Sequence, residues 1–134
     1  MNLLFMGEWG EALREMKDAI AVMDKNADHY WGQAMRLYQA WLHLHAMDFA
    51  GALAICDSAL ADYPSPRPHN IRTCLFLKGS AETALGNYER TSEYLLMAQA
   101  GMDRPAVIFD WYCRLRLESA LTELWLAKGD LAPI

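Results

Sequence analysis

The sequence predicts an all-α fold built from antiparallel helix pairs. Two observations support this prediction: a hinge-like triplet recurs along the chain, and no stretch shows the alternation of apolar and polar residues that is typical of a strand. Each triplet has a small or flexible residue, then a polar residue that can cap a helix, then an apolar residue. The triplets are Gly7-Glu8-Trp9, Met47-Asp48-Phe49, Gly86-Asn87-Tyr88 and Gly129-Asp130-Leu131, at spacings of 40, 39 and 43 residues. Recurrence over this distance indicates a helical repeat.

Residues 33–64 form the most complete predicted pair. Asp48 can cap the second helix of this pair, because its carboxylate can accept the unpaired N–H groups of a first turn. Pro64 ends the helix, since proline has no N–H and disfavours helix in the residue before it. Small residues stand where two antiparallel helices must approach closely: Ala40, Ala52 and Ala59.

The rest of the chain follows the same plan, with six main helices. A first helix over about residues 8–24 has Ala12 and Ala19 at its small positions, and Asp28 can cap the helix after it. A second pair is predicted over about 69–85 and 88–100, where Gly79 replaces Ala40 and Thr91 replaces Ala52. The last helix starts near residues 103–105 and ends near 128. We expect one domain over residues 1–134, with repeat units of roughly 1–25, 29–64, 69–101 and 104–134.

This arrangement resembles a tetratricopeptide repeat. The matching residues are Ala40, Phe49, Ala52, Ala59 and Pro64. The resemblance implies a right-handed α-solenoid (TPR-like) that acts as a binding scaffold, although the usual period of the family is shorter, at about 34 residues. The ending FDWYCRLRLESALTELWLAKGDLA is similar to long-period repeat regions in LuxR-type ATPase transcription regulators and some adenylate cyclases. The sequence begins and ends inside helix pairs, so we expect a fragment of a longer array.

Composition limits the possible functions. The chain is 54% apolar and 22% charged with a net charge of -5, which fits a folded domain and argues against general nucleic-acid binding. Cys56, Cys74 and Cys113 have no zinc or redox spacing, so we expect free, mainly buried thiols in a reducing compartment. The N-terminus lacks the features of a signal peptide, and no apolar run reaches the length of a membrane span. These features predict a cytoplasmic protein without direct membrane contact.

No catalytic or metal-binding motif is present, so we expect no enzyme activity, no cofactor and no metal. The histidines are His29, His43, His45 and His69. His43 and His45 lie two residues apart and must point to different faces of a helix, so they cannot share a metal as residues at i and i+4 would.

A binding surface is the remaining candidate site. By the resemblance, the first helix of each pair lines a concave groove. The partner-binding candidates on these helices are Leu37, Trp41, His45, Thr73, Phe76, Ser80, Tyr112, Arg116, Ser119 and Glu123. Aromatic residues and arginine are frequent interface anchors, but Trp41 and Phe76 could equally pack between neighbouring units. The lysines and asparagines with which chaperone-binding members grip a C-terminal carboxylate are absent. The expected function is non-catalytic protein–protein interaction in a bacterial signalling or transcription-regulatory protein; the alternative is a small-molecule effector domain that uses the same surface.

Two further stretches suggest contacts. Three aromatic residues in Phe109-Asp110-Trp111-Tyr112 either form a contact patch or, as we favour, fill the joint between helices. A stripe of apolar residues on the last helix is expected to be exposed. Together with Leu3, Leu4 and Phe5, this stripe would support a homodimer or end-to-end stacking through open repeat ends. The stripe consists of Leu117, Leu121, Leu124 and Trp125.

Overall fold

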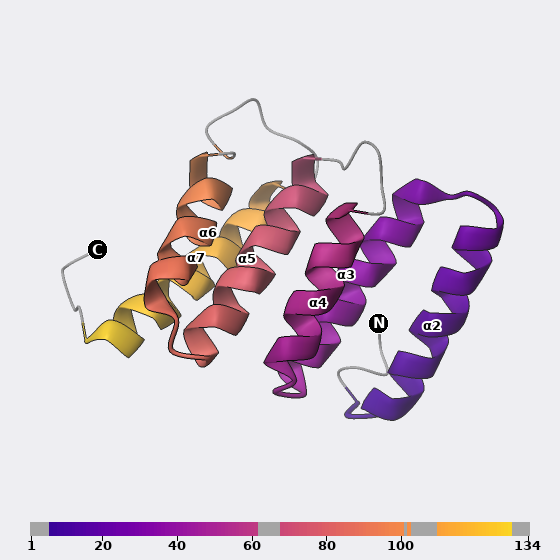
Figure 1. Ribbon diagram of the computed structural model, residues 1–134, viewed down its shortest axis with the longest axis horizontal. Coiled ribbons are helices and arrows are strands. Elements are labelled where there is room, and N and C mark those ends of the chain that lie inside the picture. The colour runs from indigo at the N-terminus through magenta and orange to yellow at the C-terminus, as the bar shows by residue number, and fades with distance from the viewer. Residues whose placement is uncertain (1–5, 62–67, 101, 103–109, 130–134) are drawn as a thin grey trace. The chain divides into compact units, whose positions relative to one another are not determined.

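The computed structural model describes residues 6–61, 68–100, 102 and 110–129, and all regular structure in these ranges is α-helical (Figure 1). The prediction of an all-α fold is confirmed for this part of the chain. The helices are α2 (Trp9–Lys25), α3 (His29–His45), α4 (Phe49–Ala61), α5 (Pro68–Ala84), α6 (Tyr88–Ala100) and α7 (Asp110–Lys128). The chain forms two compact units, Met1–Arg67 with α2 to α4 and Pro68–Ile134 with α5 to α7.

Each unit contains one closely matched helix pair. In the first unit α3 packs on α4, and in the second α5 packs on α6. Helices α3 and α5 both have 17 residues, and α4 and α6 both have 13. All four boundaries of the second pair lie 39 residues after those of the first, which agrees with the spacing of the corresponding hinges in the sequence.

Residues with a positive φ, in the left-handed conformation, lie at the boundaries of these helices. Gly86 has φ of 80°, Gly129 has 69° and Met47 has 60°, and Gly7, which precedes α2, has 82°. All four predicted hinges therefore begin with a residue in this conformation. Ala27, with φ of 53°, is a fifth such residue, and the sequence analysis did not assign it this role because alanine rarely adopts positive φ.

The hinges share one hydrogen-bond pattern. At the α3–α4 hinge, the Met47 N–H donates to the Leu44 carbonyl (3.1 Å) and the Asp48 N–H donates to the His43 carbonyl (2.9 Å). These two bonds define a Schellman motif, which satisfies the last carbonyls of a helix and turns the chain back. The same pair of bonds closes the hinges at Ala27-Asp28 and Gly86-Asn87.

Aspartate side chains begin the next helices as predicted. The Asp28 carboxylate accepts the Trp31 N–H at 3.2 Å, and the Asp48 carboxylate accepts the Gly51 N–H at 3.0 Å. Each bond satisfies an N–H that has no partner inside the helix.

The predicted small residues of the first pair are buried where α3 packs on α4. Ala40, Ala52 and Ala59 are all buried, and the amide of the buried Gln33 donates to the Ala59 carbonyl at 3.0 Å. This agrees with the expected close approach of α3 and α4.

The second pair solves the same packing problem with different residues. Thr91 is fully buried where the first pair has Ala52, and its hydroxyl donates to the Gly79 carbonyl at 3.4 Å. A Cβ added at Gly79 would lie 2.5 Å from Cδ2 of Leu95. The missing side chain at Gly79 on α5 therefore leaves room for Leu95 on α6.

Helix α7 corrects the expectation of an exposed leucine stripe. It packs against both α5 and α6, and Leu117, Leu121 and Leu124 are buried while Trp125 is half-buried. These leucines belong to the core of the second unit, so the prediction that they form an exposed end was wrong. The opposite side of α7 carries the exposed apolar side chains Trp111, Leu115 and Leu126.

The prediction that Cys56, Cys74 and Cys113 are buried thiols outside any disulfide is confirmed.

None of the helices in the described part of the chain combines the length and apolar character needed to span a bilayer. Several predictions fall outside the described residues, namely those on residues 3–5, on Pro64, on the start of the last helix before residue 110, and on the chain after residue 129.

We predict that Met47→Gly stabilises the protein by roughly 0.5–1 kcal/mol, because glycine adopts positive φ without the steric cost of a side chain. Gly86→Ala should destabilise it by about 1 kcal/mol, and since no heavy atom lies within 4 Å of the added Cβ, the cost comes from the backbone alone. Urea unfolding followed by circular dichroism measures both changes. Equal responses of the two variants would contradict the role of the left-handed residue.

We also predict that Ala52→Leu destabilises the protein by roughly 1–3 kcal/mol through overpacking. Ala61→Leu is the control, because Ala61 is exposed at the end of the same helix and surface substitutions change stability by about 0.5 kcal/mol or less. Thermal melts of the two variants give the comparison. An unaffected Ala52→Leu variant would show that α3 and α4 are not in close contact there.

Candidate functional site

The candidates on α3 are mostly core residues. Leu37 is buried and Trp41 is only 8% exposed, whereas His45 lies at the surface. The His45 ring meets the Trp41 ring edge to face, with centroids 4.7 Å apart. Trp41 therefore offers little surface to a partner, and its burial favours the packing interpretation over a ligand contact.

The candidates on α5 show the same division. Phe76 is buried, while Thr73 and Ser80 are half-buried. The helix also buries polar side chains, among them Arg72 and Asn70. Because most of α5 is buried, only the small polar side chains of Thr73 and Ser80, among its three candidates, reach the surface.

All four candidates on α7 reach the surface. Ser119 and Glu123 are exposed, and Tyr112 and Arg116 are half-buried. The Arg116 guanidinium lies over the Tyr112 ring, 5.3 Å from its centroid, at a distance typical of a cation–π contact. This contact restrains the long Arg116 side chain along the helix.

Two leucines that the sequence analysis did not select lie on the same side of α7. Leu115 is 62% exposed and Leu126 is 61% exposed. They are eleven residues apart, which is close to three helical turns. This spacing places both leucines on one face of the helix, and it could have been recognised in the sequence. We define the outer face of α7 as Tyr112, Leu115, Ser119, Thr122 and Leu126, flanked by Arg116 and Glu123.

The aromatic stretch at the start of α7 is only partly described. Trp111 is 71% exposed, and its ring meets the Tyr112 ring edge to face at 5.9 Å. The interpretation that this stretch fills a joint between helices was therefore wrong for Trp111. Phe109 lies outside the described residues.

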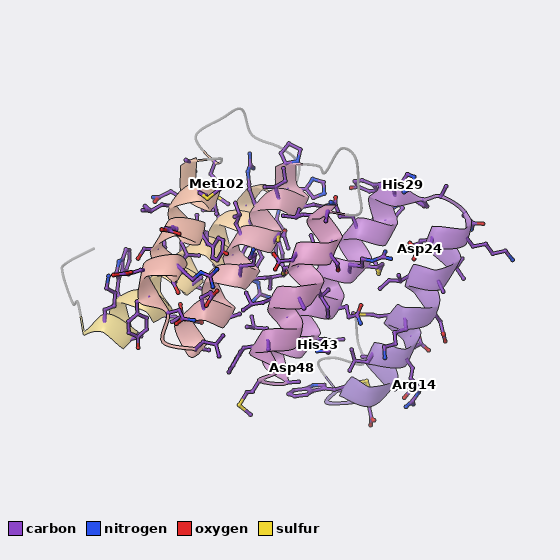
Figure 2. The ribbon with its side chains drawn as sticks, in the orientation of Figure 1. Arg14, Asp24, His29, His43, Asp48 and Met102 are labelled. Carbon is purple, nitrogen blue, oxygen red and sulfur yellow. The ribbon has the colours of Figure 1, made fainter. Side chains whose placement is uncertain are left out.

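The side chains of His43 and His45 point in different directions from α3, as predicted, and are not placed to share a metal ion. His43 points to the α3–α4 hinge, where Figure 2 shows it beside Asp48. His45 instead contacts Trp41. Among the described residues, no group of three or more His, Cys, Asp or Glu side chains is arranged to hold a metal ion.

The ionisable groups at the hinges fasten one helix to the next. His43 Nδ1 lies 2.7 Å from Asp48 Oδ2, and the other carboxylate oxygen accepts the Gly51 N–H. The hydrogen bond with His43, and then the one from Gly51, lower the pKa of Asp48 from its ordinary value of 3.8. A Cβ at Gly51 would overlap this carboxylate, so a side chain at this position would displace the cap.

The second pair contains a corresponding contact in which the acidic side chain lies on the other side of the hinge. Glu82, 39 residues after His43, is buried, and its carboxylate accepts the Asn87 amide at 2.7 Å and Arg90 Nη1 at 3.2 Å. The acidic group is thus on the first helix of this pair and on the second helix of the other. These charged side chains have a structural role, because each joins the end of one helix to the start of the next.

Helix α2 is attached to α3 by a bidentate ion pair. Arg36 donates through Nη1 to Asp24 Oδ1 at 3.1 Å and through Nη2 to Oδ2 at 2.8 Å. Two parallel bonds of this kind fix the orientation of both side chains. In the first unit, Asp24 and Arg36 thus join α2 to α3, as His43 and Asp48 join α3 to α4.

No family model matches this chain, and comparisons with curated proteins and with solved structures found no significant match. The class is accordingly defined by the fold: an all-helical protein whose matched helix pairs are closed by left-handed turns. The outer face of α7 is the best candidate site, because apolar and charged side chains are exposed there together.

We predict that Asp48→Asn reduces the acid sensitivity of the protein. The folded-state pKa of Asp48 is lowered, so its contribution to stability is present above the unfolded-state value of about 3.9 and is lost as the pH falls below it. The variant should be less stable than the wild type at neutral pH and should lose less stability between about pH 5 and pH 2.

Urea unfolding at a series of pH values measures this difference. Asp18→Asn is the charge-matched control, since Asp18 is exposed on α2. Parallel pH profiles for the wild type and Asp48→Asn would contradict a stabilising role for the ionised carboxylate.

Proposed function

We propose that this chain is a non-catalytic interaction domain that binds a protein or peptide partner through the outer face of α7. The observation that supports the proposal is the exposure of Leu115 and Leu126 beside Arg116 and Glu123. Exposed apolar side chains bordered by charges are typical of protein interfaces. An effector site would instead need an enclosed cavity with convergent polar groups.

The proposed setting is the one that the tetratricopeptide resemblance implies. The matched pairs would be units of a right-handed α-solenoid, in the sensing or assembly region of a larger bacterial signalling or transcription-regulatory protein in the cytoplasm. The 39-residue offset between the two pairs supports a repeat origin. Neither direct nucleic-acid binding nor membrane contact forms part of the proposal.

The test is selection of peptides from a random library on the whole chain, followed by calorimetry with the selected peptides. Arg116→Ala should weaken binding about tenfold, equivalent to about 1.4 kcal/mol. Lys25→Ala is the control, because Lys25 is exposed at the end of α2. Trp41→Ala should weaken binding only by destabilising the fold, by roughly 3–5 kcal/mol.

Stability must therefore be measured beside affinity for each variant. Failure of the monomeric chain to select any peptide, or equal effects of Arg116→Ala and Lys25→Ala, would contradict the proposed function. A Trp41→Ala variant that stays folded but loses binding would instead indicate that the partner binds to α3.

A further inference from the structure

The outer face of α7 has the spacing of a helix-pairing seam. Its five central residues, Tyr112, Leu115, Ser119, Thr122 and Leu126, follow one another at alternating steps of three and four. This is the pattern with which one helix packs along another, because it keeps a single stripe of side chains facing the partner. The buried leucines of α7 lie on the other side, in contact with the core of the second unit, so the seam is a second and separate face of the helix.

The seam is complementary to itself when a second copy runs antiparallel to the first. With the two-fold axis midway between residues 120 and 121, Leu115 of one copy lies opposite Leu126 of the other, and Ser119 lies opposite Thr122. Two-fold symmetry repeats each contact, so one leucine pair lies on each side of the axis, with the Ser119 and Thr122 contacts between them. The small central residues allow the helices to approach closely.

The flanking charges fit the same register. Arg116 and Glu123 are seven residues apart and therefore lie on one side of the seam. In an antiparallel pair this side of one helix meets the same side of the other, so Arg116 of each copy lies beside Glu123 of the second copy. Tyr112 already holds the Arg116 guanidinium along the helix, which lowers the conformational cost of forming the ion pair.

From this complementarity we propose that the outer face of α7 binds a second copy of this chain, as an antiparallel two-fold helix pair. The inference rests on the proposed interaction role of this face and names its partner. It uses a different surface from the leucine stripe that the sequence suggested, since that stripe is buried within the unit.

The test is sedimentation equilibrium of the whole chain over a wide concentration range, with charge-reversed variants. The wild type should form a dimer. Arg116→Glu alone and Glu123→Arg alone should each weaken dimerisation by about tenfold or more, because each places like charges together at two symmetric positions. An equimolar mixture of these two variants should recover wild-type affinity as a heterodimer, since only the mixed pair restores opposite charges on both sides of the axis.

Apolar substitutions provide the matched control. Leu115→Asp should abolish the dimer, whereas Leu96→Asp should leave it intact, because Leu96 is similarly exposed but lies on α6. Thermal melts must show that both variants fold. A wild type that stays monomeric, a dimer that tolerates Leu115→Asp, or a mixture that recovers nothing would overturn the inference. A monomer that still binds selected peptides in an Arg116-dependent way would overturn this inference alone and leave the proposed function standing.

Discussion

The left-handed residues that end α2, α3, α5 and α7 are the constraint on which the rest of the structure depends. A chain that reverses direction within three residues leaves the last carbonyls of one helix and the first N–H groups of the next without helical partners. The Schellman bonds at Met47-Asp48 and Gly86-Asn87 satisfy the carbonyls, and at Asp48 the side chain satisfies an N–H. Positive φ makes both possible in so short a segment. Without it, α3 and α4 could not lie against each other along their full length.

The tight hinge in turn limits the volume between the paired helices. In the first pair this space is filled by alanines on both helices, with Ala40, Ala52 and Ala59 buried. In the second pair Gly79 on α5 has no side chain, and Leu95 and Thr91 of α6 lie against it. The small residue thus stands on one helix only, and the facing positions on the other helix are larger, an exchange that a close-packed core can tolerate.

The acidic side chain at the hinge also changes its place between the two pairs. His43 and Asp48 close one hinge, and Glu82 with Asn87 and Arg90 closes the other. Glu82 is buried, yet its carboxylate oxygens accept bonds from both neighbours, which offsets the cost of removing a charge from water. Charged residues near the hinges are thereby accounted for by structure. On the outer face of α7, the apolar side chains of Leu115 and Leu126 are exposed beside Arg116 and Glu123.

The sequence by itself determined the helices, the hinges at Met47 and Gly86 and the small residues of the first pair, because capping, left-handed turns and close approach each require particular residue types at local spacings. It did not reveal the left-handed Ala27, since the conformation there is imposed by the hinge and not favoured by alanine. Burial on α7 was decided only by the tertiary structure. Leucines occur on both sides of this helix, so its pattern allowed either Leu117 and Leu121 or Leu115 and Leu126 to face the core. The contacts with α5 and α6 selected the first set, and long-range packing of this kind is not encoded in the periodicity of a single helix.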